Sequence, residues 1–178
     1  MKGSATPEFE TSGDHGTCLV FGTHIVIMEP SEDGGENVSI WHRTGTAKGE
    51  AACRMGKNPY AQIKDTDNNS FFGISAVYFF IDTGTSAGSR TLLVYRTETG
   101  EKVTDVDYFA GDVQPRIEAA RYLYYDALSE TKGLASACPQ AAKWRKQGGS
   151  VAWLQAKRMD LNARTTTSIG SLRCAYQE

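Results

Sequence analysis

The chain contains four cysteines, Cys18, Cys53, Cys138 and Cys174, and their spacing constrains the fold more than any other feature. No two of them lie within a few residues of each other, as the close cysteine pairs of zinc sites do. Cys53 follows Cys18 by 35 positions, and Cys174 follows Cys138 by 36 positions. We therefore predict two disulfides, Cys18–Cys53 and Cys138–Cys174, each closing a local loop. The alternative is four buried, reduced cysteines in a cytosolic protein. Disulfides instead predict an exported protein, periplasmic or extracellular.

Length and charge narrow the classes of function. The 178 residues are 40% hydrophobic, which is enough for one domain with a sizeable core. The formal net charge of −2 provides little attraction for nucleic acid or for an anionic membrane. No apolar run approaches the roughly 20 residues that span a bilayer. We therefore expect neither a nucleic-acid partner nor a membrane span.

The N-terminal segment has the composition of a tag. Residues 1–10 read MKGSATPEFE and lack the apolar stretch of a signal peptide. We expect residues 1–13 to be a tag or disordered leader, and residues 14–178 to form a single β-rich domain.

Short runs of β-branched and aromatic residues, separated by Gly-rich turns, indicate a mainly β fold. We predict an antiparallel sandwich or barrel with one or two short helices, stapled by two disulfides. The apolar run at 71–81 is expected to be one central strand, or two strands broken at Gly73. Residues 116–128 fit either a helix or a strand, and their tyrosines favour the strand. A short helix is expected within 139–147. The other strands are expected at 18–28, 38–43, 50–55, 61–64, 91–97, 101–106, 151–161 and 165–176.

Residues 79–86 read FFIDTGTS, which resembles the active-site segment of aspartic peptidases. That resemblance implies that Asp82 is a catalytic carboxylate and that Thr83 and Gly84 shape the loop around it. Two carboxylates that share a proton activate the water in such enzymes. The chain has no second Asp-Thr-Gly, so the resemblance implies a retroviral-type homodimer. The alternative, which we favour, is a Gly/Ser/Thr loop joining two strands, with Asp82 forming a local Asx-type hydrogen bond.

A broader pattern is F-x-D-x-G-T at 80–85, R-x-L-x-V-Y at 90–95 and T-G-x-K-V at 99–103. It is similar to a segment of small exported bacterial β-rich proteins of unknown function, and it implies no activity. Asp82 and Arg90 would bracket one loop at the mouth of a hairpin, which makes both of them candidate binding residues.

Aromatic side chains next to cations supply the other candidates. Tyr122 and Tyr124 alternate along one predicted strand, and Trp144 lies in the sequence Lys-Trp-Arg-Lys. Tyrosine, tryptophan and arginine are enriched at binding hot spots. The alternative is ordinary core packing of the rings beneath the stems of basic side chains.

No metal or other cofactor is predicted. Asp65-x-Asp67-x-Asn69 begins like a calcium loop, but Ser70 and Ala76 stand where an EF-hand needs Gly and Glu. A solvated turn is the expected structure. His24 and His42 would approach each other if their strands pair, but two ligands make a poor metal site.

These observations predict a non-enzymatic exported binding module for a protein or cell-envelope ligand. An inhibitor or immunity-type protein acting on a hydrolase is its most concrete form. The alternative function is a homodimeric aspartic peptidase that uses Asp82.

Overall fold

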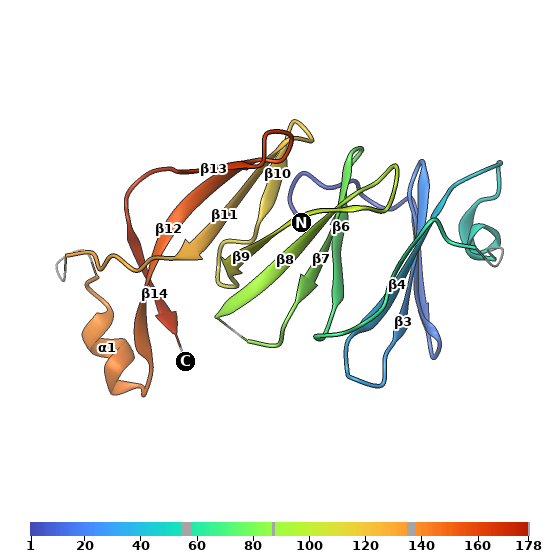
Figure 1. The fold of residues 1–178 in the computed structure, drawn as a ribbon. Helices are drawn as coiled ribbons and strands as arrows, with labels where there is room; N and C mark the ends of the chain where they lie inside the picture. Colours follow the sequence, from blue (N-terminus) through green and yellow to red (C-terminus); the bar gives the residue numbers. More distant parts are fainter. Residues whose placement is uncertain (55–57, 87, 135–137, 178) are drawn as a thin grey trace. The chain divides into compact units, whose positions relative to one another are not determined.

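The computed structural model describes residues 1–54, 58–86, 88–134 and 138–177 (Figure 1). Within these ranges the fold is mainly antiparallel strand with one six-residue helix, as the sequence predicted, and it also contains one 3-10 turn. Tertiary contacts divide the chain into two compact units. The N-terminal unit comprises Ser4–Gly84 and Leu93–Val103, and the C-terminal unit comprises Met1–Gly3, Thr85–Leu92 and Thr104–Glu178. Each unit contains one disulfide.

A meander of five antiparallel strands forms the first sheet of the N-terminal unit. Its strands are β1 Phe9–Gly13, β2 Gly16–Val20, β3 His24–Pro30, β4 Glu36–His42 and β5 Ala61–Ile63. The hairpin of β3 and β4 and the short strand β5 confirm the strands expected at 38–43 and 61–64. The Ser31 N–H donates to the Gly35 carbonyl at 2.9 Å and closes the polar turn between β3 and β4.

Two segments near the N-terminus differ from the sequence prediction. The strand expected at 18–28 is two strands, because the chain reverses after Val20. The Phe21 N–H donates to the His24 carbonyl at 2.8 Å across this turn, which contains Gly22. Within the expected leader, residues Phe9–Gly13 form β1, whose five residues all pair with β2.

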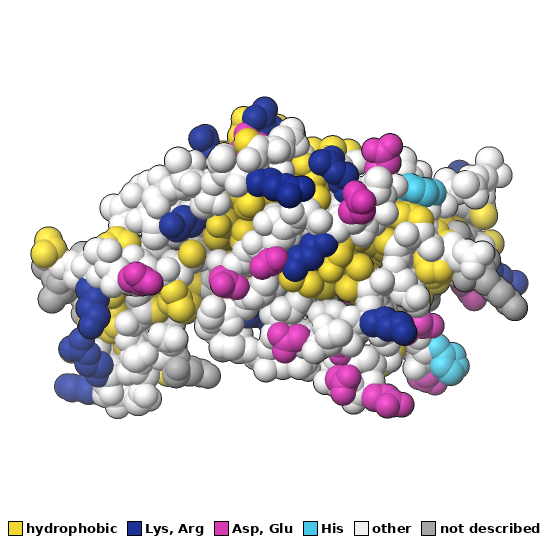
Figure 2. Space-filling view, viewed as in Figure 1, with side chains coloured by type: hydrophobic (Ala, Val, Ile, Leu, Met, Phe, Trp, Pro, Cys, Tyr) yellow, Lys and Arg dark blue, Asp and Glu magenta, His cyan; other side chains and the backbone are white. Residues whose placement is uncertain are grey.

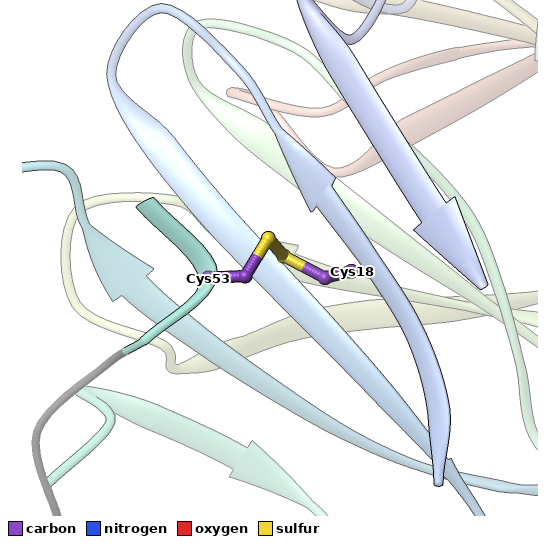
Figure 3. The surroundings of a disulfide bond; sticks show 2 residues. All are labelled: Cys18 and Cys53. Carbon is purple, nitrogen blue, oxygen red and sulfur yellow. A yellow bond between two sulfur atoms is a disulfide. The ribbon is translucent and has the colours of Figure 1, made fainter. Parts of the chain in front are cut away.

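The first disulfide ties a 3-10 turn to the sheet. Residues 50–55 were expected to include a short strand, but Gly49–Cys53 form this turn, and Met55 lies outside the described residues. Alanine and glutamate, which make up most of the turn, are poor strand formers. Cys53 is bonded to Cys18 of β2, with 6.2 Å between their Cα atoms, so the predicted pairing is confirmed (Figure 3).

The most apolar run forms two strands, β6 Ser70–Ile74 and β7 Tyr78–Thr83. The break lies after Ile74 rather than at Gly73. The Ser75 N–H donates to the Tyr78 carbonyl at 2.7 Å, and the Tyr78 N–H donates to the Ser75 hydroxyl at 3.0 Å. Gly73, with φ of +156°, instead marks an irregularity in the register of β6 against β7.

The N-terminal unit is a β-sandwich. Strands β6 and β7 are followed by the hairpin of β8 Ser89–Arg96 and β9 Lys102–Phe109, of which 93–96 and 102–103 belong to this unit. The hairpin confirms the strands expected at 91–97 and 101–106. The inner side chains of the meander pack against those of β6, β7 and the end of β8. The rings of Phe79 and Tyr95 stack there, with centroids 4.9 Å apart. The buried core comprises Phe21, Val26, Met28, Val38, Ile40, Ala61, Ile74, Phe79, Ile81 and Tyr95.

The sheet of the C-terminal unit is built around its longest strand, β12 Ser150–Asp160. The remaining elements of this unit are β10 Arg116–Glu118, β11 Tyr122–Leu128, α1 Ala141–Lys146, β13 Thr165–Ser168 and β14 Arg173–Gln177. Strand β11 pairs with one side of β12, and β13 and β14 pair with the other side. The second disulfide joins Cys138 to Cys174 of β14, with a Cα–Cα distance of 5.7 Å, as predicted.

The predicted strand at 151–161 is confirmed as β12, and two further predictions of secondary structure in this unit are confirmed and one is wrong. The tyrosine-rich segment is a strand, and a short helix lies within 139–147. The segment 165–176 is two strands rather than one, because Gly170, with φ of +67°, lies in the break between β13 and β14.

Strand β12 changes its buried side along its length. Ala152 and Leu154 are buried near its start, whereas Met159, which points to the opposite side, is buried near its end. Phe109 of β9 packs on Ala152 and Leu154. The side of β12 that carries the even-numbered residues is therefore covered near Ala152 and Leu154 and open near Arg158 and Asp160. The candidate site lies at this open end.

Candidate binding site

The open side of the C-terminal sheet brings Tyr122 and Tyr124 together with charged side chains. Tyr122 pairs with Asp160 and Tyr124 pairs with Arg158, and directly opposed residues point to the same side of a sheet. Leu123 and Tyr125, on the other side, are buried. We call this open side the recognition face; it comprises Arg116, Glu118, Tyr122, Tyr124, Arg158 and Asp160.

Arginine side chains lie over both tyrosine rings. The guanidinium carbon of Arg116 is 4.3 Å from the centroid of the Tyr124 ring. The guanidinium carbons of Arg121 and Arg158 are 5.0 and 5.3 Å from the centroid of the Tyr122 ring. All three distances fall within the roughly 6 Å over which a cation is attracted to a ring face. Each of the two rings therefore has at least one guanidinium group within cation–π distance.

Two ion pairs secure the same face. Arg116 binds Glu118, and Arg121 binds Asp160. The hydrogen bond from Arg121 is the main reason that the pKa of Asp160 is lowered to about 2. Asp160 therefore remains charged at any pH at which the protein would work. Among the described residues, Arg158 has no ion pair, so its charge is available to a partner.

A further ion pair extends this side of the sheet toward helix α1. Arg173 of β14 binds Asp126 of β11, whose side chain is only 4% exposed. Asp126 also lines a cavity of about 110 Å³ beside Arg116 and Tyr124. The Asp126–Arg173 pair thus connects the recognition face to a larger pocket that Arg173 lines.

The larger pocket, of about 390 Å³, contains the third predicted aromatic residue, Trp144. Its ring meets that of Tyr176 edge to face, with centroids 6.2 Å apart. Phe109 and Leu154 are also among the residues that line it. We call it the aromatic pocket. Trp144 therefore lies apart from Tyr122 and Tyr124, although the Asp126–Arg173 pair connects the two sites.

Asp82 lies in a strand rather than in a loop. Strand β7 runs to Thr83, and Asp82 and Thr83 are 5% and 7% exposed. The apolar run ends at Ile81, but the buried strand continues through these two polar residues, with Asp82 opposite Ser70 of β6. Gly84 follows the strand, and its N–H donates to the Asp67 carbonyl at 2.8 Å. Arg90 is half-buried in β8 and belongs to the other compact unit.

The Asp65 carboxylate serves as a hydrogen-bond hub. It accepts from the Ser31 hydroxyl and from the backbone N–H groups of Gly35, Asp67 and Asn69 at 3.0, 3.3 and 2.7 Å. The hydrogen bond from Ser31 is the largest cause of the lowered pKa of Asp65. These donors occupy the oxygens that a calcium ion would need. Throughout the described ranges, no three His, Cys, Asp or Glu side chains are grouped to hold a metal ion.

His24 and His42 are opposite each other on β3 and β4, as the sequence suggested, with ring centroids 5.3 Å apart. The His42 ring stacks on Tyr60 at 4.0 Å. Burial, and then the charge of His42, lower the pKa of His24 below 6.5. His24 is therefore favoured in its neutral form.

Sequence reasoning missed Arg116, Arg158, Asp126, Arg173 and Tyr176 as site residues. The sequence did contain one pattern from which two pairs of these charged residues could have been found. Arg116 and Glu118, and likewise Arg158 and Asp160, stand two positions apart, which puts each pair on one side of a strand. The pairing of Asp126 with Arg173, 47 positions away, left no such local signal.

The comparisons with known proteins add no assignment. No protein-family model matches the chain, and neither a curated protein nor a solved structure matches it. No helix in the described part of the chain is both long and apolar enough to cross a membrane.

Proposed function

We propose that this chain is an exported, non-enzymatic binding module that recognises a protein partner through the recognition face. The observation that carries the proposal is the alternation of two half-buried tyrosine rings with guanidinium groups on one side of the sheet: Arg116 lies over Tyr124, and Arg158, which is opposite Tyr124 in the register, lies over Tyr122. Tyrosine and arginine are the residues that most often dominate the energy of a protein interface.

The charges of the face favour a partner with acidic groups at the point of contact. Glu118 and Asp160 are each engaged by an arginine, whereas Arg158 has no ion pair among the described residues. A carboxylate of the partner could form a bidentate pair with Arg158. Inhibition of an exported hydrolase, or immunity against one, is the form of the proposal that we favour.

The exported location is supported by the pairing of all four cysteines into disulfides. Such bonds form and persist in oxidising compartments. Separation of the producing cell into cytosolic and exported fractions, followed by detection of the chain, checks this part of the proposal.

The recognition face is tested with a purified partner. A protein retained from exported extract by the immobilised chain is purified, and its Kd is measured with the unchanged chain, Tyr124→Ala and Arg158→Ala. Each substitution is expected to weaken binding about tenfold or more. Lys64→Ala, which removes an exposed charge from the N-terminal unit, is the control and should leave Kd unchanged. Equal affinity of all four proteins would reject the recognition face as the binding site.

The peptidase alternative has a separate test, and no observation on the described residues favours it over the binding module. It requires acid-optimum proteolysis by the purified chain that disappears in Asp82→Asn. It also requires a homodimer, which light scattering measures directly.

A further inference from the structure

The aromatic pocket has the size of a small-molecule site. Its volume of about 390 Å³ falls within the roughly 300–1,000 Å³ that is usual for ligand pockets. Its buried lining includes Phe109 and Leu154, which are 3% and 0% exposed. These two residues form an apolar base of the pocket, and they are already packed in the absence of a ligand.

Two aromatic rings, Trp144 and Tyr176, form part of the wall of the pocket. Trp144 and Tyr176 meet at an interplanar angle of 65°, so each presents a different surface. Gly149 packs so closely under the Tyr176 ring that a Cβ at this position would lie 2.0 Å from a ring carbon. The absence of a side chain at Gly149 thus makes room for Tyr176 at the edge of the pocket.

Polar groups of three kinds surround this apolar surface. The exposed Asp112 carboxylate can only accept, the exposed Gln140 amide can donate and accept, and the Arg173 guanidinium can only donate. Gln140 and Trp144, four positions apart at the start of helix α1, both line the pocket. Within the described residues, the side chains of Asp112 and Gln140 form no hydrogen bond or ion pair, so their capacity remains for a ligand.

We propose that the aromatic pocket binds a neutral saccharide. One side of a pyranose ring is a flat patch of C–H groups that can pack on Trp144, while its hydroxyls both donate and accept hydrogen bonds. Asp112, Gln140 and Arg173 together provide the acceptors and donors that such hydroxyls need. This site is additional to the protein-binding role proposed above, and it does not depend on that role.

An organic ammonium ion is the main competing ligand, because aromatic rings and a carboxylate also attract cations. The charges around the pocket oppose it. Arg173 lines the pocket, and Lys143 precedes Trp144 on helix α1. Figure 2 shows lysine and arginine side chains gathered over α1. A neutral ligand avoids this repulsion.

The test is saturation-transfer NMR on the full chain with neutral disaccharides of hexoses and of N-acetylhexosamines, and with tetramethylammonium in a parallel sample. We expect saturation transfer to at least one disaccharide. Trp144→Ala should weaken its binding about tenfold or more, and Asp112→Asn and Gln140→Ala should each weaken it several-fold. The last two substitutions affect exposed side chains, so they report on binding even if Trp144→Ala disturbs the helix.

Two controls separate this site from its surroundings. Arg145→Ala changes the same helix on the side that lines a different cavity, and it should leave saccharide binding unchanged. Tyr124→Ala tests independence from the recognition face and should also have no effect. No transfer to any disaccharide would overturn the proposal, as would binding that none of the three pocket substitutions changes. Binding of tetramethylammonium instead, lost in Asp112→Asn, would identify a cation site and would equally overturn it.

Discussion

Arg116 lies over the ring of Tyr124, with 4.3 Å between the guanidinium carbon and the ring centroid, while the same guanidinium group binds Glu118. A side chain held by two partners at once is well ordered before any ligand arrives. We expect the cation–π contact to contribute about 0.5–1 kcal/mol, as exposed contacts of this kind do. A double-mutant cycle of Arg116→Ala and Tyr124→Ala, measured by urea unfolding, should give a coupling energy in this range. Strict additivity would mean that the arginine and the ring do not interact in solution.

Removal of Arg173 should be more costly than removal of an ordinary surface charge. Arg173→Ala leaves the carboxylate of Asp126 buried without its cation. Loss of one partner from a fully buried pair costs about 3–5 kcal/mol. Because Arg173 is itself 40% exposed, we expect a smaller loss of about 2 kcal/mol.

The control for this prediction neutralises the Asp126 carboxylate that Arg173→Ala leaves without a cation. Asp126→Asn combined with Arg173→Ala should recover part of the stability lost in Arg173→Ala alone, as measured by urea unfolding. If the double variant is no more stable than the single variant, an unpaired buried charge is not the cause of the loss.

Gly149→Ala should displace the ring of Tyr176. A methyl group at this position would meet the ring at 2.0 Å, so the ring must move away from Trp144. We expect a stability cost of about 1 kcal/mol or more, at the lower end for an overpacked site because Tyr176 is partly exposed. We also expect weaker saccharide binding. Gly13→Ala is the matched control, since a Cβ there would have nothing within 4 Å. Equal melting temperatures for the two variants would contradict the close packing of Gly149 under Tyr176.

Each disulfide should stabilise mainly the unit that contains it. Replacing Cys138 and Cys174 with serine removes the closure of a loop of 36 residues. The chain-entropy treatment gives about 3–4 kcal/mol for a loop of this length. Helix α1 and the aromatic pocket should be affected, whereas the sandwich of the N-terminal unit should keep its hydrogen-exchange protection. The reciprocal variant, with Cys18 and Cys53 replaced, should show the opposite pattern. Uniform loss of protection in either variant would indicate that the whole chain unfolds as one unit.

Mild acid should destabilise the N-terminal unit through His24. The pKa of His24 is lowered by burial and by His42, so the folded state binds its proton less readily than the unfolded state does. The contribution of His24 to stability is therefore complete above its ordinary pKa of 6.5 and is lost as the pH falls through 6.5 toward the lowered pKa. Melting temperatures at about pH 7.5 and about pH 5.5 measure this loss, which should be smaller in His24→Gln. His15→Gln, at an exposed histidine, should behave like the unchanged chain.

The parts of the fold that could be predicted are those with short-range causes. The hairpin of β8 and β9 follows from a Thr-Gly turn between two alternating segments, and the strand β11 follows from its tyrosines. The breaks were harder to place. Gly22 in the first apolar segment was interpreted as a bulge, but it lies in a turn, because β2 and β3 gain a ladder by folding on each other. In the central run a serine, whose hydroxyl and backbone bind Tyr78, ended the strand where a glycine was expected to.

The candidate site was predictable in its aromatic residues and not in its partners. Tyr122 and Tyr124 were expected to share a side of a strand, and they do. Which charges lie beside them depends on the register of β10 and β12 against β11, and no local rule supplies that register. Asp82 shows the opposite error, because it was expected to begin a loop and lies instead in the buried strand β7, which runs to Thr83.

The connectivity of the cysteines also bears on how the protein is made. Each cysteine is bonded to its neighbour in the sequence, the first to the second and the third to the fourth. When such a chain emerges N-terminus first into an oxidising compartment, Cys18 meets its correct partner 35 positions later, well before Cys138 has appeared. Oxidation in order of emergence thus yields the native pairing directly. The chain should need little help from a disulfide isomerase during its biogenesis.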